Sequence, residues 1–165
     1  MNPTAEARAR FFNESGQMLP PFVSSGWRGC ALDRDGYDNT RIPQFLFEAI
    51  AAAAGSAEVF VCGYFPAGES CASLAPTWQA FRSHLLGQDN WSLEYVVFDS
   101  SQRWALLADA DATIFGAEPA LASAVDSYLA GHGTSLVQLT ESEFPGLSPE
   151  QPGARYLLAV AGPVS

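Results

Sequence analysis

Lysine is absent from this sequence of 165 residues, and all eight of its basic residues are arginine. Aspartate and glutamate together number 18, so the formal net charge is −10 at pH 7. Proteins that bind nucleic acids or anionic membranes through general attraction need positive charge to displace counterions. The composition therefore predicts no nucleic-acid partner and no membrane partner, and it favours a partner that is itself basic.

Long apolar runs are also missing. The N-terminal stretch M-N-P-T-A-E-A-R-A-R is not followed by the apolar segment of a secretory signal, and no apolar run of about 18 residues is available to span a membrane. Cys30, Cys62 and Cys71 are odd in number, and their spacing matches no zinc site. Because unpaired thiols favour a reducing compartment, we expect a cytoplasmic protein without a bound metal.

The 48% hydrophobic content is sufficient for one domain over residues 1–165 to bury a core. Apolar periodicity, first-turn prolines and terminal glycines predict helices over 4–14, 42–54, 76–86 and 118–130. Runs of β-branched and aromatic residues predict strands near 27–32 and over 58–65, 92–98, 103–108, 112–115 and 155–160.

The short connections between the predicted strands indicate how the sheet is built. Only four residues separate 92–98 from 103–108, which favours an antiparallel hairpin, and the next strand follows after D-A-D. The stretches 66–75 and 144–153 are predicted to be loops. The expected fold class is α+β, a single domain with a largely antiparallel sheet, a meander around residues 92–116, and helices packed on one side.

The segment A-L-L-A-D-A-D-A-T-I-F-G at 105–116 places two carboxylates and a threonine after an apolar strand. The order D-x-D-x-T resembles the first motif of the haloacid-dehalogenase-type phosphatases, in which one Asp is the nucleophile. Phosphoryl transfer also needs a cation for the phosphate and late acids for Mg²⁺, whereas the chain has no Lys and only 52 residues follow Thr113. We therefore interpret Asp109 and Asp111 as solvated residues of a hairpin turn and expect no catalytic role.

The stretch D-R-D-G-Y-D-N at 33–39 has the composition of a calcium loop without its spacing. Aligning its glycine with the sixth position of a calcium-binding hand puts apolar residues at the first and twelfth positions, where ligands are required. Asp and Asn around a glycine are ordinary turn residues. We expect an exposed acidic loop that carries Asp33, Asp35 and Asp38 and holds no metal.

Residues suited to nucleophilic catalysis are scattered along the chain. Ser70 lacks the second glycine of a nucleophile elbow, and His84 and His132 are the two imidazoles. The alternative function is therefore a small hydrolase whose site is assembled from Asp109, His132, Cys30 and Ser70. An acidic adaptor or structural subunit is a third hypothesis.

Residues 96–129 combine a strand, a turn, a Trp that leads a second strand, a short acidic turn, a third strand ending in glycine, and a helix. This pattern resembles a segment common in small bacterial immunity proteins of polymorphic or contact-delivered toxin systems. The matching framework residues are Phe98, Trp104, Leu106, Leu107, Ile114, Phe115, Gly116, Leu121, Val125 and Leu129.

The resemblance implies a stoichiometric antitoxin that acts in the cytoplasm of a toxin-producing bacterium, with no cofactor and no catalytic residue. It would bind a cognate effector with a basic cleft and block the active site of that effector, since an acidic surface associates quickly with such a cleft. Between Arg103 and Arg155 the sequence has seven acids and no Arg or Lys. The candidate contact residues are Asp109, Asp111, Glu118, Asp99, Asp33, Asp35 and Asp38.

Overall fold

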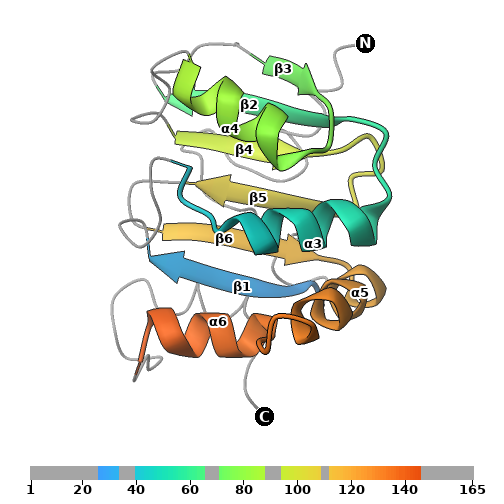
Figure 1. Cartoon of the computed structure of the whole chain (residues 1–165), viewed down its shortest axis with the longest axis vertical. Coiled ribbons are helices and arrows are strands. Elements are labelled where there is room, and N and C mark those ends of the chain that lie inside the picture. The colour runs from blue at the N-terminus through green and yellow to red at the C-terminus, as the bar shows by residue number, and fades with distance from the viewer. Residues whose placement is uncertain (1–25, 34–39, 66–70, 88–93, 109–111, 146–165) are drawn as a thin grey trace.

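A six-stranded sheet forms the centre of the computed structural model, which describes residues 26–33, 40–65, 71–87, 94–108 and 112–145. All neighbouring strands are antiparallel, in the order β1-β6-β5-β4-β2-β3 (Figure 1). The strands are β1 (Arg28–Asp33), β2 (Val59–Phe65), β3 (Cys71–Leu74), β4 (Glu94–Phe98), β5 (Trp104–Ala108) and β6 (Ala112–Ala117). The helices in these ranges are α3 (Gln44–Ala54), α4 (Trp78–Gly87), α5 (Pro119–Ala130) and α6 (Leu136–Glu143).

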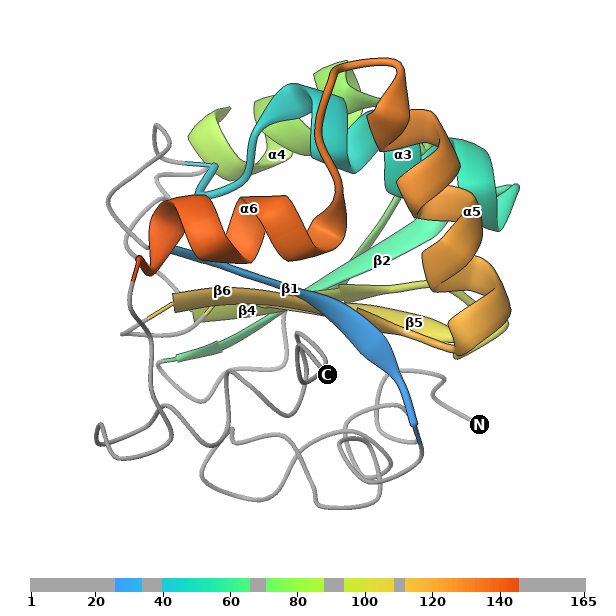
Figure 2. The same ribbon diagram turned by 90° about the horizontal axis from the view of Figure 1, so that it is seen from below.

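The described helices all lie on one face of the sheet, as Figure 2 shows in a view of the sheet edge-on from the β1 side. This arrangement confirms the predicted α+β class with an antiparallel sheet and helices on one side. Among these helices, none combines the length and the apolar character that a membrane crossing requires.

The predicted meander is confirmed by the pairing of β4 with β5 and of β5 with β6. The β4–β5 turn closes through a hydrogen bond from the N–H of Gln102 to the carbonyl of Asp99, 3.1 Å long. Gln102 takes a φ of 54°, the left-handed conformation that a tight connection demands. The predicted short strand near 27–32 is also present, as β1, and it pairs with β6 at the end of the sheet order.

Helix boundaries follow the predicted signals closely. α3 begins directly after Pro43 and ends at Gly55, whose φ of 60° allows its N–H to donate to the carbonyl of Ala51. α5 begins at Pro119, as the sequence predicts. The predicted helix 4–14 and strand 155–160 lie outside the described residues.

Two elements differ from the sequence predictions. Cys71–Leu74 lies in the stretch predicted to be a loop, yet it forms β3 and pairs with β2. Its small residues carry no hydrophobic alternation, so its strand conformation comes from pairing with β2. The eight-residue helix α6 was not predicted, since a helix this short has little periodicity to read.

Side chains from both faces of the sheet are buried. On the helix-facing side the cluster includes Leu32, Tyr95, Val97, Leu106 and Phe115 of the sheet, packed against apolar residues of all four described helices. The opposite face carries Trp27, Cys62, Val96, Phe98, Ala105, Leu107, Ala112 and Ile114. Each residue of β5 is therefore buried. Within the described strands, the charged residues lie at the two ends of the sheet, where the connections leave it.

Candidate functional site

The antiparallel pairing sorts the candidate contact residues to two opposite ends of the sheet. At one end, Asp33 pairs with Ala112 and Tyr95 pairs with Ala108; we call this the Asp33 end. At the other, Phe98 pairs with Ala105, and the chain continues into Asp99; we call this the Asp99 end. Glu118 follows β6 at the Asp99 end.

Four of the predicted contact residues lie outside the described residues: Asp35, Asp38, Asp109 and Asp111. They belong to the connections 34–39 and 109–111, which leave the sheet after Asp33 and after Ala108. Both strand ends are at the Asp33 end. Among the described candidates, the sheet topology therefore separates Asp33 from Asp99 and Glu118.

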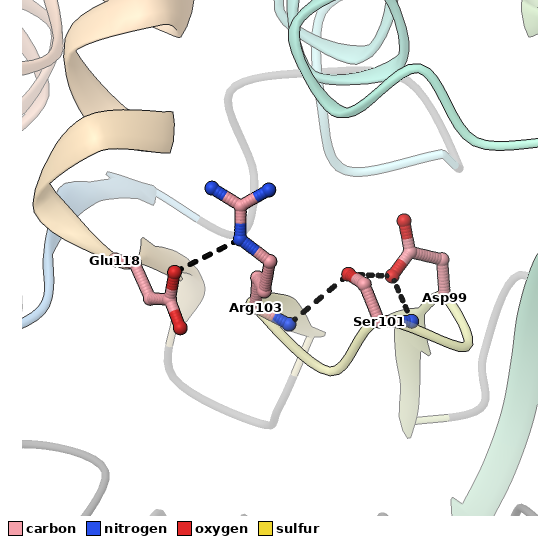
Figure 3. Close-up of polar contacts among 4 residues, drawn as sticks. All are labelled: Asp99, Ser101, Arg103 and Glu118. Carbon is pink, nitrogen blue, oxygen red and sulfur yellow. Dashed lines mark hydrogen bonds and ion pairs between the residues drawn. The ribbon is translucent and has the colours of Figure 1, made fainter.

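The side chain of Asp99 is directed into the β4–β5 turn, where it is only 5% exposed (Figure 3). One carboxylate oxygen accepts hydrogen bonds from the N–H of Ser101 at 2.9 Å and from its hydroxyl at 2.5 Å. The other accepts a hydrogen bond from the hydroxyl of Ser56 at 2.5 Å. Because Ser56 follows α3, the carboxylate connects the end of this helix to the hairpin.

Burial disfavours the charged form of Asp99, but its neighbours outweigh burial and lower the pKa of this carboxyl below the ordinary value. These neighbours are the hydroxyls of Ser101 and Ser56, the indole of Trp104 and the backbone N–H of Ser101. The indole Nε1 of Trp104 is buried without a hydrogen bond of regular geometry, so we ascribe its effect to its dipole. Asp99 is thus a buried structural anion of the turn, and its role as a contact residue stays a prediction.

Replacing Asp99 with asparagine is expected to lower the free energy of unfolding at pH 7 by about 2 kcal/mol, because charge-assisted hydrogen bonds are lost in a buried turn. A lowered folded-state pKa contributes stability that is complete above the ordinary carboxyl value of 3.8 and is lost as the pH falls through the folded-state value. Urea unfolding between pH 7 and pH 2.5 should therefore show a smaller acid-induced loss for Asp99→Asn than for the wild type.

The exposed Glu141 supplies the control for this experiment, because Glu141→Gln removes one negative charge from a solvated position on α6. This variant should retain both the stability at pH 7 and the full acid-induced loss. A pH profile of Asp99→Asn that parallels the wild type would contradict the assigned role of Asp99.

Glu118 is exposed at the Asp99 end, but its charge is paired (Figure 3). Its carboxylate lies 2.9 Å from Nε of Arg103, and its N–H donates to the carbonyl of Arg103 at 3.0 Å. A solvent-exposed ion pair of this kind adds at most about 1 kcal/mol to stability. It does, however, offset the negative charge of Glu118.

The Asp33 end gains acidic residues from α6 that were not among the predicted contacts. The hydroxyl of Thr140 accepts a hydrogen bond from the N–H of Ala31 at 3.0 Å, which fixes α6 beside β1. From that contact α6 continues toward the Asp33 end, where it terminates with Glu141 and Glu143 (Figure 1). Glu141 is exposed and Glu143 is half-buried, as is Asp33.

A buried polar cluster supports the start of α3 at the same end. The hydroxyl of Tyr95 donates to the carbonyl of Thr40 at 2.5 Å, and the hydroxyl of Thr40 donates to the carbonyl of Ile42 at 3.2 Å. Arg41 is only 4% exposed and has a φ of 62°, an uncommon conformation for a residue with a side chain. Burial raises the pKa of Tyr95, and the positive charge of Arg41 opposes this rise.

The residues of the alternative hydrolase site are not assembled by the described structure. Cys30 is fully buried in β1, and burial together with the charges of Asp126 and Glu143 raises the pKa of its thiol, which suppresses the nucleophilic thiolate. His132 is exposed after α5 and stacks on Phe45, with 5.4 Å between ring centroids.

The other groups considered for catalysis are equally dispersed. Asp109 and Ser70 lie outside the described residues. His84 is on α4, where burial lowers its pKa. Cys62 is buried in β2, whereas Cys71 is exposed on β3. Within the described ranges, no group of three or more His, Cys, Asp or Glu side chains is placed to hold a metal ion.

Comparison of the chain with protein-family models, with curated proteins and with solved structures finds no match.

Proposed function

We propose that this protein is a stoichiometric immunity protein, which binds a cognate bacterial toxin in the cytoplasm and blocks the active site of that toxin. The resemblance of residues 96–129 to a segment of small bacterial immunity proteins supports this proposal, as does the net charge of −10 without any lysine. In this proposal the toxin presents a basic cleft, and the antitoxin fills it with the Asp33 end of the sheet.

The distribution of exposed acid in the fold is the observation that carries the proposal. Asp33, Glu94, Glu141 and Glu143 belong to the Asp33 end, and each is at least partly exposed. Arg41, the arginine at this end within the described ranges, is buried. At the opposite end Asp99 is buried in its turn, Glu118 is paired with Arg103, and Glu58 accepts a hydrogen bond from the hydroxyl of Ser73.

An acidic surface of this kind acts on association more than on dissociation. Complementary charge accelerates diffusional encounter and discriminates against partners of the same sign, and both effects weaken as ionic strength rises. Asp33 and Glu94 belong to strand ends and Glu141 and Glu143 to a helix end, so these acids are held by regular structure before binding, which lowers the entropic cost of binding.

The proposal predicts that neutralising the Asp33 end weakens toxin binding. We expect the triple variant Asp33→Asn, Glu141→Gln and Glu143→Gln to bind the cognate toxin at least about tenfold more weakly at low salt, chiefly through slower association. The slope of affinity against salt should also decrease. Surface plasmon resonance between 50 and 500 mM salt would measure both quantities.

A matched variant provides the control, because Glu48→Gln, Glu58→Gln and Glu118→Gln also remove three charges. Glu48 is exposed on α3, and the other two lie at the Asp99 end. This control should keep the wild-type salt slope and most of the affinity. Equal losses for the two triple variants would show that net charge, and not the Asp33 end, governs binding.

A further inference from the structure

β1 is an edge strand, because it pairs with β6 and with no other strand of the described sheet. In an antiparallel ladder, alternate residues direct their backbone groups toward the partner strand and away from it. The N–H of Ala31 donates to Thr140 and not to β6. Gly29, Ala31 and Asp33 therefore form the outward set of β1, and Cys30 and Leu32 belong to the inward set.

An outward row of backbone groups can accept an additional strand from another molecule, and native proteins protect such edges. Here the protection comes from α6, which runs along the free side of β1 (Figure 1). Thr140 is 7% exposed, and its hydroxyl both accepts from Ala31 and donates to the carbonyl of Leu136 at 3.3 Å. Its oxygen thus occupies the position that a strand carbonyl would take.

The helix has its own supports, which do not depend on Thr140. The hydroxyl of Ser135 accepts a hydrogen bond from the N–H of Gln138 at 3.1 Å. The carboxylate of Asp126 on α5 accepts a hydrogen bond from the N–H of Leu136 at 2.8 Å. Leu136 and Leu139 are buried beneath the helix. Removal of the Thr140 hydroxyl should consequently loosen α6 from the β1 edge without unfolding the helix itself.

We infer that α6 is an edge cover which keeps β1 from pairing with β1 of a second copy of this chain, and that Thr140 is the residue that closes the edge. The outward set suits such self-pairing. Two antiparallel copies of β1 related by a twofold axis at Ala31 pair Ala31 with Ala31 and Gly29 with Asp33, outward residue against outward residue. Gly29 has no side chain and Ala31 has only a methyl group, which leaves room for the approach.

The isosteric variant Thr140→Val tests this inference, with Thr140→Ser as the variant that retains the hydroxyl. In Thr140→Val we expect amide hydrogen exchange at Ala31 to rise at least about tenfold, while exchange at Cys30 changes much less. Sedimentation velocity should then show concentration-dependent dimers for Thr140→Val and monomers for Thr140→Ser and the wild type. If the Ala31 amide of Thr140→Val exchanges as slowly as in the wild type, the inference is overturned. It is also overturned if this amide exchanges faster and no dimers form.

The wild-type protein offers a second test that needs no substitution. In hydrogen exchange at low denaturant concentrations, the Ala31 amide should open together with the amides of α6, because α6 is its hydrogen-bond partner. The Cys30 amide, which faces β6, should open only with global unfolding. If Ala31 and Cys30 open with the same free energy and the same denaturant dependence, α6 is not a separable cover.

Discussion

Replacing Gly29 with alanine is expected to destabilise the protein by about 4 kcal/mol or more, enough to unfold many single domains. A Cβ atom added at Gly29 would lie 1.6 Å from the carbonyl oxygen of Phe115 and 2.6 Å from its carbonyl carbon. Both are backbone atoms of β6, so no side-chain rotation can relieve the overlap. The β1–β6 ladder would have to open, and with it the attachment of α6.

Gly87 provides the matched control for this substitution. A Cβ added at this exposed last residue of α4 meets no atom within 4 Å. Gly87→Ala should therefore leave stability unchanged or raise it by about 0.5–1 kcal/mol, since alanine restricts the unfolded chain. Urea unfolding followed by circular dichroism measures both variants. A Gly29→Ala protein within about 1 kcal/mol of the wild type would contradict the close β1–β6 approach.

The second large effect is expected for Phe81→Ala, which should cost about 3–5 kcal/mol. Phe81 on α4 is 0% exposed and stacks on Phe47 of α3, with 4.6 Å between ring centroids. Trp78 and Tyr95 surround the same ring at centroid distances of 5.8 and 6.0 Å. Deleting the ring leaves a cavity where α3, α4 and β4 meet, and rigid aromatic neighbours cannot fill it.

Tyr128 serves as the control, because it is an aromatic residue on α5 that is 51% exposed. Tyr128→Ala should change the free energy of unfolding by no more than about 0.5 kcal/mol. Denaturant titration of the two variants distinguishes loss of core packing from loss of an aromatic side chain in general. Similar costs at the two positions would contradict the central place assigned to Phe81.

The elements that could be predicted from the sequence are those defined by local signals. The hairpin between β4 and β5 follows from two apolar runs four residues apart, and α5 follows from Pro119 and its apolar spacing. The strand β3 lacked such a signal, because Cys71–Leu74 becomes a strand only through pairing with β2.

The candidate site could be predicted only in part, because burial and pairing are tertiary properties. Asp99 was selected as an acid in a turn, yet it accepts a hydrogen bond from Ser56, which is 43 positions away in the sequence. Glu141 and Glu143 were visible in the acidic interval after Arg103. Their place beside β1 depends on the contact between Thr140 and Ala31, which are 109 positions apart.

The proposed immunity function requires one chain to bind one toxin molecule and to block its active site. The most direct measurement is a titration of the activity of the proposed cognate toxin with this chain, at low salt and at fixed toxin concentration. The account predicts a sharp end point at one chain per toxin, and a higher apparent Kd in 500 mM salt. If far less than one chain per toxin molecule inactivates the toxin, the chain acts as a catalyst. If the toxin keeps its full activity in the presence of excess chain, the immunity function is contradicted.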